Sequence, residues 1–389
     1  MSELDTSKIR VAALSDQDSI ALAQFYRQAW NASAPADDTA PNQVAPNQGC
    51  PFVAGLPPPV TGVFVDEQIV GHLGSIPTEL WDGSRSHGAH WLKGFMVLES
   101  YRNGPIGYLL LKHMMKQVSL SAVMTVAPAA RRLFAACGFK DFGSVPNYIT
   151  VIRPTRLLQA IDPDKLGLAS LPAALRSVMR AAKLGPVAWL LGGCAGLGLA
   201  LLDAVNWVWA WGLQARVLKG PPPIAEIDEL WRQLRERLDL APSRSGAYID
   251  WRYVASSAGR YEFIEVRRGK RLAALAVVRR SERVDERLAG LHLGLVVDLI
   301  VDPQDSAAAG AALLAARGWG RRAGCDAVLL TISHRGIGRL VKRLGYVKIP
   351  GNVNFMLRVP SGVPTEAMHA PKDMERSWLT RGDAWGDDI

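Results

Sequence analysis

The stretch that decides the fold is YRNGPIGYLL, residues 101–110, which follows the apolar run LKGFMVLES at residues 92–100. Glycines and a proline separate that run from leucines at helical spacing, so the sequence predicts a strand, a tight turn and a helix. A helix that begins in this way presents unpaired backbone N–H groups and the positive end of its dipole. The stretch therefore predicts either a phosphate or diphosphate site, or an ordinary strand-to-helix connection.

Strands and helices alternate on both sides of this stretch. Before it, the hydrophobic periodicity predicts a strand at 9–14, a helix at 16–30, a hairpin at 62–80 that turns at 66–68, and a strand at 86–100. After it, we expect a helix at 107–117, a strand at 118–126, a helix at 130–139 and a closing strand at 148–154. This order predicts an α/β fold.

The second half repeats this order of elements. We expect a helix at 226–238, an aromatic-rich element at 248–254, a strand–turn–strand at 261–280, a strand at 291–301, a helix at 306–322, a strand at 325–332, and a helix followed by a strand at 335–349. The sequence thus predicts two tandem domains with mixed sheets flanked by helices. Their predicted ranges are 1–155 and 221–360, with a basic helical and apolar, tryptophan-rich linker at 156–220 and a tail at 361–389.

The composition indicates a folded protein with an anionic partner. Hydrophobic residues make up 49% of the 389 residues and charged residues 21%, which is enough to bury cores. The net charge of +9 favours nucleotide phosphates or an acidic membrane surface, and without dense basic blocks among aromatics we expect no nucleic acid. The four cysteines lack metal-site spacing, so we expect no metal. The N-terminus lacks the apolar core of a signal peptide, which predicts a cytoplasmic protein.

Two motifs resemble those of the GNAT superfamily of acyl-CoA-dependent N-acyltransferases. The acyl-CoA signature of that family, Q/R-x-x-G-x-G/A between a strand and a helix, matches Arg102 and Gly107. Its second motif, a helix that ends in Gly-Phe, matches Leu133-Phe134 and Gly138-Phe139. The resemblance covers residues 9–153 and, more weakly, 246–358. It implies tandem GNAT-like domains and acetyl-CoA as the acyl donor.

The resemblance also implies where the donor binds. The amides of the 102–108 turn would hold the diphosphate, the pantetheine arm would pair with the strand that ends at Glu99, and a side chain at Gly107 would block the phosphates. The implied cofactor-binding residues are Met96, Val97, Arg102, Asn103, Gly104, Ile106, Gly107, Tyr108, Arg131 and Phe134.

The sequence departs from the family where protons are transferred. The first signature glycine falls on Pro105, the tyrosine that often acts as general acid falls on Phe134, and the asparagine before it falls on Ala127. Amine acylation still needs a group that removes a proton from the amine. Our candidates for this base are Glu99 first, then Glu79 and His90.

The second half lacks the glycine turn, since alanines follow its strand and Ser306 is a reasonable helix N-cap. We therefore expect one CoA site, in the first half. Residues 248–254 and the tail resemble segments of tandem-GNAT proteins of bacterial surface-polysaccharide pathways. That resemblance implies Trp251, Arg252 and Asp383 as acceptor-binding residues and an amino sugar or another small amine as acceptor.

Residues 184–213 form an apolar segment with tryptophans at 189, 207, 209 and 211. Residues 184–202 carry no charge and could span a bilayer as a helix, but its glycines, Asp203 and Asn206 predict interruptions. The residues leave three interpretations open: a membrane contact in the interface plane, a helical pair buried between the domains, or a transmembrane helix.

The leading hypothesis is an acetyl-CoA-dependent N-acyltransferase that acts on an amino sugar or another small amine, and the resemblance of the tail implies a role in polysaccharide biosynthesis. Two alternatives remain open. Pro105, Phe134 and Ala127 are compatible with a catalytically silent acyl-CoA-binding sensor or scaffold. The tandem architecture is also compatible with peptide or aminoacyl transfer in cell-wall assembly. The oligomeric state does not follow from the sequence.

Overall fold

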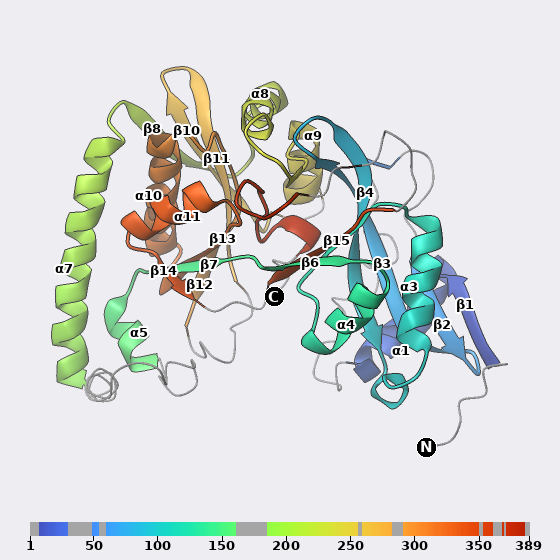
Figure 1. Ribbon diagram of the computed structural model, residues 1–389. Coiled ribbons are helices and arrows are strands. Elements are labelled where there is room, and N and C mark those ends of the chain that lie inside the picture. The colour runs from blue at the N-terminus through green and yellow to red at the C-terminus, as the bar shows by residue number, and fades with distance from the viewer. Residues whose placement is uncertain are drawn as a thin grey trace. The chain divides into compact units, whose positions relative to one another are not determined.

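Two compact units make up the chain, each with one mixed β-sheet and helices packed on it (Figure 1). Unit 1 comprises Met1–Ser144 and Asn352–Lys372, and unit 2 comprises Val145–Gly351 and Asp373–Ile389. The predicted α/β class with two mixed sheets is confirmed. The computed structural model describes residues 8–29, 49–53, 60–160, 185–255, 259–281, 291–349, 353–360, 368 and 371–385.

The sheet of unit 1 has the strand order β1-β2-β3-β4-β5-β15-β6. Its neighbours pair antiparallel, except β4 and β5, which run parallel. The first hairpin turns at Asp66 and Glu67, whose positive φ angles of 46° and 63° are those of a type I′ turn, as the predicted turn at 66–68 requires. The strands are β1 Ile9–Ala13, β2 Thr61–Val65, β3 Gln68–Trp81, β4 Ser86–Val97, β5 Ser121–Met124, β6 Lys140–Ser144 and β15 Asn354–Arg358.

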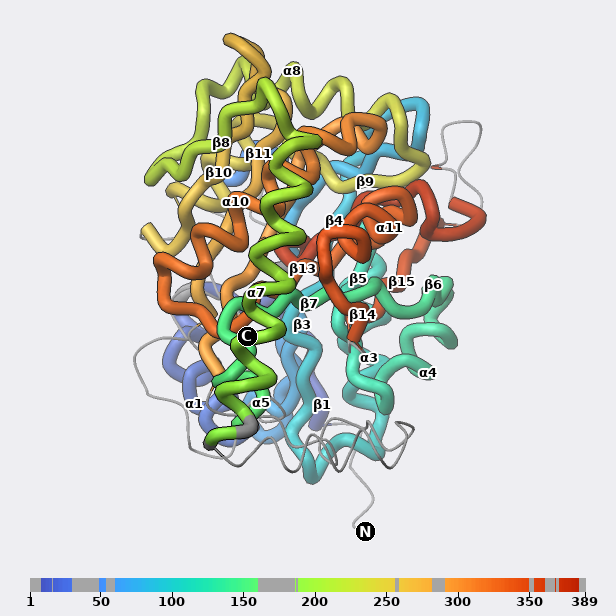
Figure 2. Tube along the Cα trace, turned by 90° about the vertical axis from the view of Figure 1, so that its left-hand side faces the viewer, coloured from blue at the N-terminus to red at the C-terminus, as the bar shows by residue number. Residues whose placement is uncertain are grey.

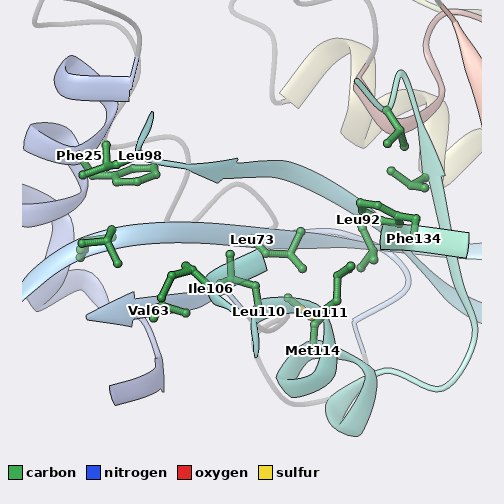
Figure 3. Packing of buried hydrophobic residues seen from close by; sticks show 14 of the residues in the cluster. Phe25, Val63, Leu73, Leu92, Leu98, Ile106, Leu110, Leu111, Met114 and Phe134 are labelled. Carbon is green, nitrogen blue, oxygen red and sulfur yellow. The ribbon is translucent and has the colours of Figure 1, made fainter. Parts of the chain in front are cut away.

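Helices cover both faces of this sheet. The missing side chain of Gly71 faces α3, since a Cβ there would lie 2.7 Å from Ile106 Cγ2. The next residue, His72, contacts Tyr26 of α1, so α1 and α3 lie on opposite faces. The α3 side chains Ile106, Leu110, Leu111 and Met114 are fully buried, and Figure 3 shows them beside Leu73. The helices are α1 Ser19–Ala29, α3 Ile106–Gln117 and α4 Pro128–Ala136, with short 3-10 turns η2 Asp16–Asp18 and η3 Glu99–Tyr101.

The sheet of unit 2 has the strand order β14-β7-β13-β12-β11-β10-β8. Its central strands read as continuous apolar runs, and every residue of β12 is buried. Its strands are β7 Asn147–Val151, β8 Leu213–Leu218, β10 Glu262–Arg268, β11 Arg271–Arg280, β12 Leu293–Val301, β13 Ala327–Thr331 and β14 Val347–Ile349, and the two-residue strand β9 Ala241–Pro242 lies outside this sheet. The helices are α5 Pro154–Ala160, α7 Gly185–Trp209, α8 Ile224–Arg235, α9 Gly246–Asp250, α10 Ser306–Arg322 and α11 Arg335–Arg343, with a π-helical turn η5 Trp251–Ala255 and a 3-10 turn η7 Asp383–Trp385.

The two sheets differ from a simple tandem repeat in one strand each. The expected closing strand of the first repeat, β7, pairs with β13 and β14 of unit 2. In unit 1 its place between β5 and β6 is taken by β15, which follows β14 in the chain. Phe355 of β15 fits there, because its ring contacts the rings of Trp91 and Phe142 at centroid distances of 6.1 and 5.6 Å. The compact units thus exchange strands near both predicted domain boundaries.

The apolar segment forms one continuous helix, α7, which its glycines, Asp203 and Asn206 do not break. The interpretation as a buried helical pair is wrong, since only 17% of its most apolar window is buried. This helix is long and apolar enough to cross a membrane by length and composition. The basic part of the predicted linker, residues 161–184, lies outside the described residues.

Candidate active site

The candidate site of unit 1 begins where two parallel strands separate. Among the described residues, β4 and β5 pair only at His90–Ser121 and Trp91–Ala122. Beyond that point β4 continues to Val97 while β5 ends at Met124. Beyond Trp91 the edge of β4 that faced β5 therefore has no strand partner there; this strand separation is here called the β4–β5 slot, and its free backbone groups can bond to an extended ligand.

A β-bulge lies in β4 along this slot. Opposite β3, His72 pairs with Met96 and Gly74 with Lys93, so β4 carries one extra residue around Gly94. Gly94 has a φ of +66°, which favours glycine there. Its carbonyl lies 2.9 Å from Nδ1 of His72, and that nitrogen lies 3.1 Å from the Tyr26 hydroxyl. The glycine within the apolar run at 92–97 was the sequence signal for this bulge, which our sequence analysis missed.

The open end of the slot adjoins the first turn of α3. The N-cap residue is Pro105, and no side chain in the described part of the chain caps this helix. Residues 102–105 are exposed, so the first amides of α3 face a solvent-accessible turn. Arg102 donates from Nε to the carbonyl oxygen of Val97 at 3.2 Å, which places its guanidinium between strand end and helix start. Uncapped amides, a helix dipole and a guanidinium together can hold a diphosphate.

The structure brings most of the predicted cofactor residues to this one end of β4 and α3. Met96 and Val97 are half-buried at the strand end, and Asn103 and Gly104 form the exposed turn. Ile106 is fully buried, so only its backbone amide is available to a ligand. Tyr108 is 47% exposed one turn into the helix.

Gly107 has a different role from the one we expected. A Cβ at this position would lie 3.0 Å from Leu133 Cδ2 and 3.1 Å from Phe95 Cζ. The missing side chain therefore faces the helix α4 and the strand β4, not the phosphate approach. Gly107 allows α3 to pack closely on these neighbours, and a larger residue would disturb the site through packing.

Two predicted cofactor residues on α4 have partners within unit 1. Phe134 is fully buried, with its ring edge-to-face against Phe95 at 5.2 Å and Phe139 at 5.1 Å. Arg131 donates from Nε to Asp141 at 3.0 Å. Phe134 thus belongs to the aromatic core beneath the bulge, and Arg131 is held by a carboxylate.

The three candidate bases lie on three different elements: His90 on β4, Glu79 on β3 and Glu99 in η3. His90 lies at the closed end of the slot, opposite Pro77 of β3, and Glu79 is a diagonal neighbour on the same sheet face. Glu99 is exposed in η3, beside the start of α3. Val97 and His90 are about 23 Å apart along the strand at about 3.3 Å per residue. Burial lowers the pKa of His90 to about 4, so its imidazole is neutral near pH 7.

The predicted acceptor residues lie inside unit 2. Trp251, Arg252 and Asp383 are only 4%, 1% and 1% exposed. Asp383 accepts a 2.8 Å hydrogen bond from Arg244, which also donates to Asp298 at 2.9 Å. Burial raises the pKa of Asp383 to about 6, although Arg244 opposes the shift. Arg252 donates to the hydroxyl of Tyr261 at 3.1 Å. Arg244, Asp298 and Asp383 thus form a buried ionic core, here called the Arg244 cluster. The three predicted acceptor residues are buried and do not form an exposed acceptor surface.

The equivalent slot of unit 2 is filled by its own chain. Strands β12 and β13 also run parallel and pair only at their first residues, Leu293–Val296 with Ala327–Leu330. Beyond these, residues 377–382 bond to both sides: Trp378 Nε1 donates to Leu299 O at 2.7 Å, and Ser333 N donates to Leu379 O at 3.1 Å. The N-cap of α10 is Asp305, whose carboxylate accepts from Ala308 N at 3.0 Å, so the expected cap at Ser306 is wrong by one residue.

Comparison with known proteins identifies the fold. No protein-family model matches the sequence, and no curated protein sequence matches it. A GCN5-related N-acetyltransferase from Kribbella flavida superposes with a TM-score of 0.54 at 14% identity, covering 90% of this chain and 71% of that one. An N-myristoyltransferase from Saccharomyces cerevisiae with bound myristoyl-CoA superposes with a TM-score of 0.55 at 11% identity, covering 96% and 88%. The predicted GNAT-like fold is confirmed.

Proposed function

We propose that this protein is an N-acyltransferase that uses an acyl-CoA donor and an amine acceptor. The observation that carries the proposal is the open β4–β5 slot leading to the uncapped start of α3 in unit 1. The likeness to N-acetyltransferases and to an N-myristoyltransferase with bound myristoyl-CoA supports it. The donor would supply an activated acyl group, and acetyl-CoA is the donor implied by the sequence resemblance.

Unit 1 would bind the donor in a fixed direction. The amides at the start of α3 and the guanidinium of Arg102 would hold the diphosphate, and the free edge of β4 would bond to the pantetheine arm. The arm then runs from Val97 toward His90, so the thioester lies at the closed end of the slot. Glu99 stands at the diphosphate end, which makes it a poor candidate for the base.

His90 is the better candidate for the proton acceptor. It lies in the paired part of β4 and β5 next to their separation, and burial keeps its imidazole neutral near pH 7, so it can accept a proton from the attacking amine although a pKa of about 4 makes it a weak base. Glu79, on the same face of the sheet, is placed to stabilise the imidazolium that forms. This assignment replaces Glu99 as the first candidate.

For the acceptor, we propose a small amine such as an amino sugar or an envelope glycan precursor in the cytoplasm. This proposal rests only on the resemblance of residues 248–254 and of the tail to polysaccharide-pathway proteins. The side chains of Trp251, Arg252 and Asp383 do not add to it, because they are buried. A peptide amine is the alternative acceptor, and the likeness to an N-myristoyltransferase favours it.

A second candidate function is acyl-CoA binding without turnover. The observation that favours it is the burial of Phe134 between Phe95 and Phe139, where the family often carries a proton-donating tyrosine. Such a protein would serve as a sensor or scaffold, and it would use the same donor site.

The donor site can be tested by placing a charge at the turn. Asn103→Glu puts a carboxylate beside the positive end of α3 and should weaken CoA binding about tenfold, or 1.4 kcal/mol. Calorimetry with CoA, acetyl-CoA and myristoyl-CoA measures this loss and reveals the preferred acyl length. Asn103→Gln is the matched control and should bind within about twofold of the parent. Equal affinities of the Glu and Gln variants would place the phosphates elsewhere.

Turnover distinguishes the enzyme from the silent protein. Thiol release should be measured with amino sugars, small amines and peptides as acceptors. We expect His90→Gln to lower kcat about 100-fold while CoA affinity stays unchanged, because a general base contributes at least that factor. Glu99→Gln is the matched control and should retain its rate. Donor binding without thiol release from any acceptor would support the sensor reading.

A further inference from the structure

The polar and apolar sides of α7 are placed opposite to those of an ordinary surface helix: its charged residue faces the protein and its apolar residues face outward. Its one charged residue, Asp203, points into unit 2, where it pairs with the buried Arg317 and accepts from Arg321 Nη2 at 2.9 Å. The other polar side chain near this end, Asn206, donates to the helix's own Leu202 carbonyl at 2.8 Å. In a surface helix of a soluble domain, charged residues normally face outward.

The outward side of α7 consists of apolar side chains. Figure 2 shows α7 in front of unit 2, with no other described element of that unit lying over it. Trp209 is 79% exposed and Trp189 72% exposed, at opposite ends of the helix. We call this side the outer face of α7, and its large members are Trp189, Leu190, Leu197, Leu201, Val205, Trp207, Val208 and Trp209, continued by Trp211.

A face of this size requires an apolar environment. The 25 residues of α7 extend about 37 Å at 1.5 Å per residue. Soluble monomers rarely expose a contiguous apolar surface of such extent, and such surfaces mark contacts with membranes or proteins. Tryptophans at both ends suit the boundary between headgroups and acyl chains.

Cationic side chains flank the outer face at both ends. Near the C-terminal end, a groove of about 1040 Å³ lies between α7, β8 and α10, and Arg216, Arg321 and Arg322 line it beside Trp207. Near the N-terminal end lie Arg156 of α5 and Arg153, which directly precedes α5, with side chains 53% and 42% exposed. Both pair with the single buried carboxylate of Asp326, so together they keep a net positive charge. This pattern complements anionic headgroups. In a two-fold contact across α7, the arginines of two copies would approach one another.

The packing of α7 decides between lying on a membrane and crossing it. At Gly192, a Cβ would lie 2.7 Å from the backbone nitrogen of Thr155, so α5 lies directly against the first half of α7. The second half is fixed to α10 by Asp203 and Arg317. If α7 crossed the bilayer, these ion pairs and the attached sheet would enter the hydrocarbon, which is strongly unfavourable.

We propose that α7 lies flat in the interface of an anionic membrane, with its outer face among the upper acyl carbons and the flanking arginines on lipid phosphates. The protein is then peripheral, held by one face of unit 2. This inference does not depend on the proposed acyltransferase activity. Of the interpretations left open by the sequence, we therefore favour a helix in the interface plane over a transmembrane helix.

Vesicle flotation of the full chain tests the proposal. We expect at least tenfold stronger binding to vesicles with 30% phosphatidylglycerol than to pure phosphatidylcholine vesicles. Leu201→Glu with Val205→Glu should lower that binding at least tenfold. Ile20→Glu on α1, also an exposed apolar residue at 73%, is the matched control and should bind like the parent. Arg216→Glu with Arg322→Glu should abolish the preference for anionic lipid. Circular dichroism confirms that each variant is folded.

The depth of α7 separates the remaining outcomes. One variant carries a fluorophore on the exposed Cys194, and a second carries it at position 208 through Val208→Cys with Cys194→Ser. Quenching of each fluorophore by brominated lipids measures its depth in the bilayer. Equal, shallow depths support the in-plane helix, whereas a deep Cys194 with a shallow position 208 would overturn it in favour of a span. Parent and Leu201→Glu/Val205→Glu proteins that bind vesicles equally would also overturn it. The proposal would also be overturned if the parent does not bind vesicles but forms a soluble dimer that Leu201→Glu/Val205→Glu dissociates.

Discussion

The helices α3 and α10 begin in the same structural position but differ in what their first turns contact. Each follows a strand that carries a one-residue bulge, at Gly94 in β4 and at Val297 in β12. The start of α3 is uncapped and exposed, whereas α10 is capped by Asp305, which also pairs with Arg268 at 2.9 Å. The start of α3 in unit 1 is therefore left without a side-chain cap, whereas the carboxylate of Asp305 caps the start of α10 in unit 2.

The slots beside these helices differ in the same way. In unit 2, residues 377–382 bond to the free edges of β12 and β13, and the Arg244 cluster anchors that segment through Asp383 and Thr380. In unit 1, the corresponding edge of β4 has no such segment among the described residues. The same strand separation is thus filled by the chain itself in unit 2 and, among the described residues, left open to a ligand in unit 1.

Breaking the Arg244 cluster should give the largest effect. Arg244 is fully buried and donates to Asp298, Asp383, Thr380 and the Pro242 carbonyl. Arg244→Ala leaves two carboxylates buried without their cation and should lower the free energy of unfolding by about 3–5 kcal/mol. Urea unfolding followed by circular dichroism measures this loss.

The control for Arg244 is an arginine with exposed ion pairs. Arg232 bonds to the exposed carboxylates of Glu229 and Glu236, so Arg232→Ala should leave the urea midpoint nearly unchanged. Similar losses for the two variants would mean that the Arg244 cluster does not hold the C-terminal segment in place.

Much of the element order of both units could be predicted from the sequence, because it rests on local periodicity, but β6, β8 and β15 were not among the expected strands. Apolar runs indicated β2 and β3, and the polar residues between these runs indicated the turn at Asp66 and Glu67. The exchange of β7 and β15 could not be predicted, since both strands are short and apolar enough to fit either sheet. Their partners are selected by contacts distant in sequence, such as Phe355 with Trp91.

The candidate site could be predicted as far as its backbone. The glycines and proline at 104–107 indicated an exposed helix start, and the structure has it. The side chains were harder: Gly107 and Phe134 proved to serve packing, and Asp383 belongs to an ionic core. Burial and partners such as these depend on tertiary structure, which residue type alone does not reveal.

Acidification should change the stability of the two units in opposite directions, through His72 in unit 1 and Asp383 in unit 2. Burial lowers the pKa of His72 to about 4, while an unfolded histidine titrates near 6.5. The unfolded chain therefore binds more protons between these values, so unit 1 loses stability as the pH falls from 6.5 toward 4. The pKa of Asp383 is raised to about 6, so the contribution of this group to unit 2 decreases as the pH rises from about 4 to about 6.

The variant His72→Phe isolates the histidine. The stability difference between parent and variant should shrink by about 2 kcal/mol between pH 7 and pH 5. Urea unfolding at both pH values measures the change, and hydrogen exchange assigns it to unit 1. A difference that stays constant would show that His72 does not titrate between its folded and unfolded states.

Removing the cap of α10 should have the smallest effect on stability. It tests whether the cap or the filled slot keeps CoA out of unit 2. Asp305→Ala frees the amide of Ala308 and should lower the free energy of unfolding by about 1 kcal/mol, while Asp305→Asn should retain most of the cap. The variant recreates the uncapped helix start of unit 1, but residues 377–382 still fill the slot beside it. Calorimetry should therefore still find one CoA bound per chain. If a second CoA binds, the cap alone closes the site in unit 2, and the filled slot does not exclude the ligand.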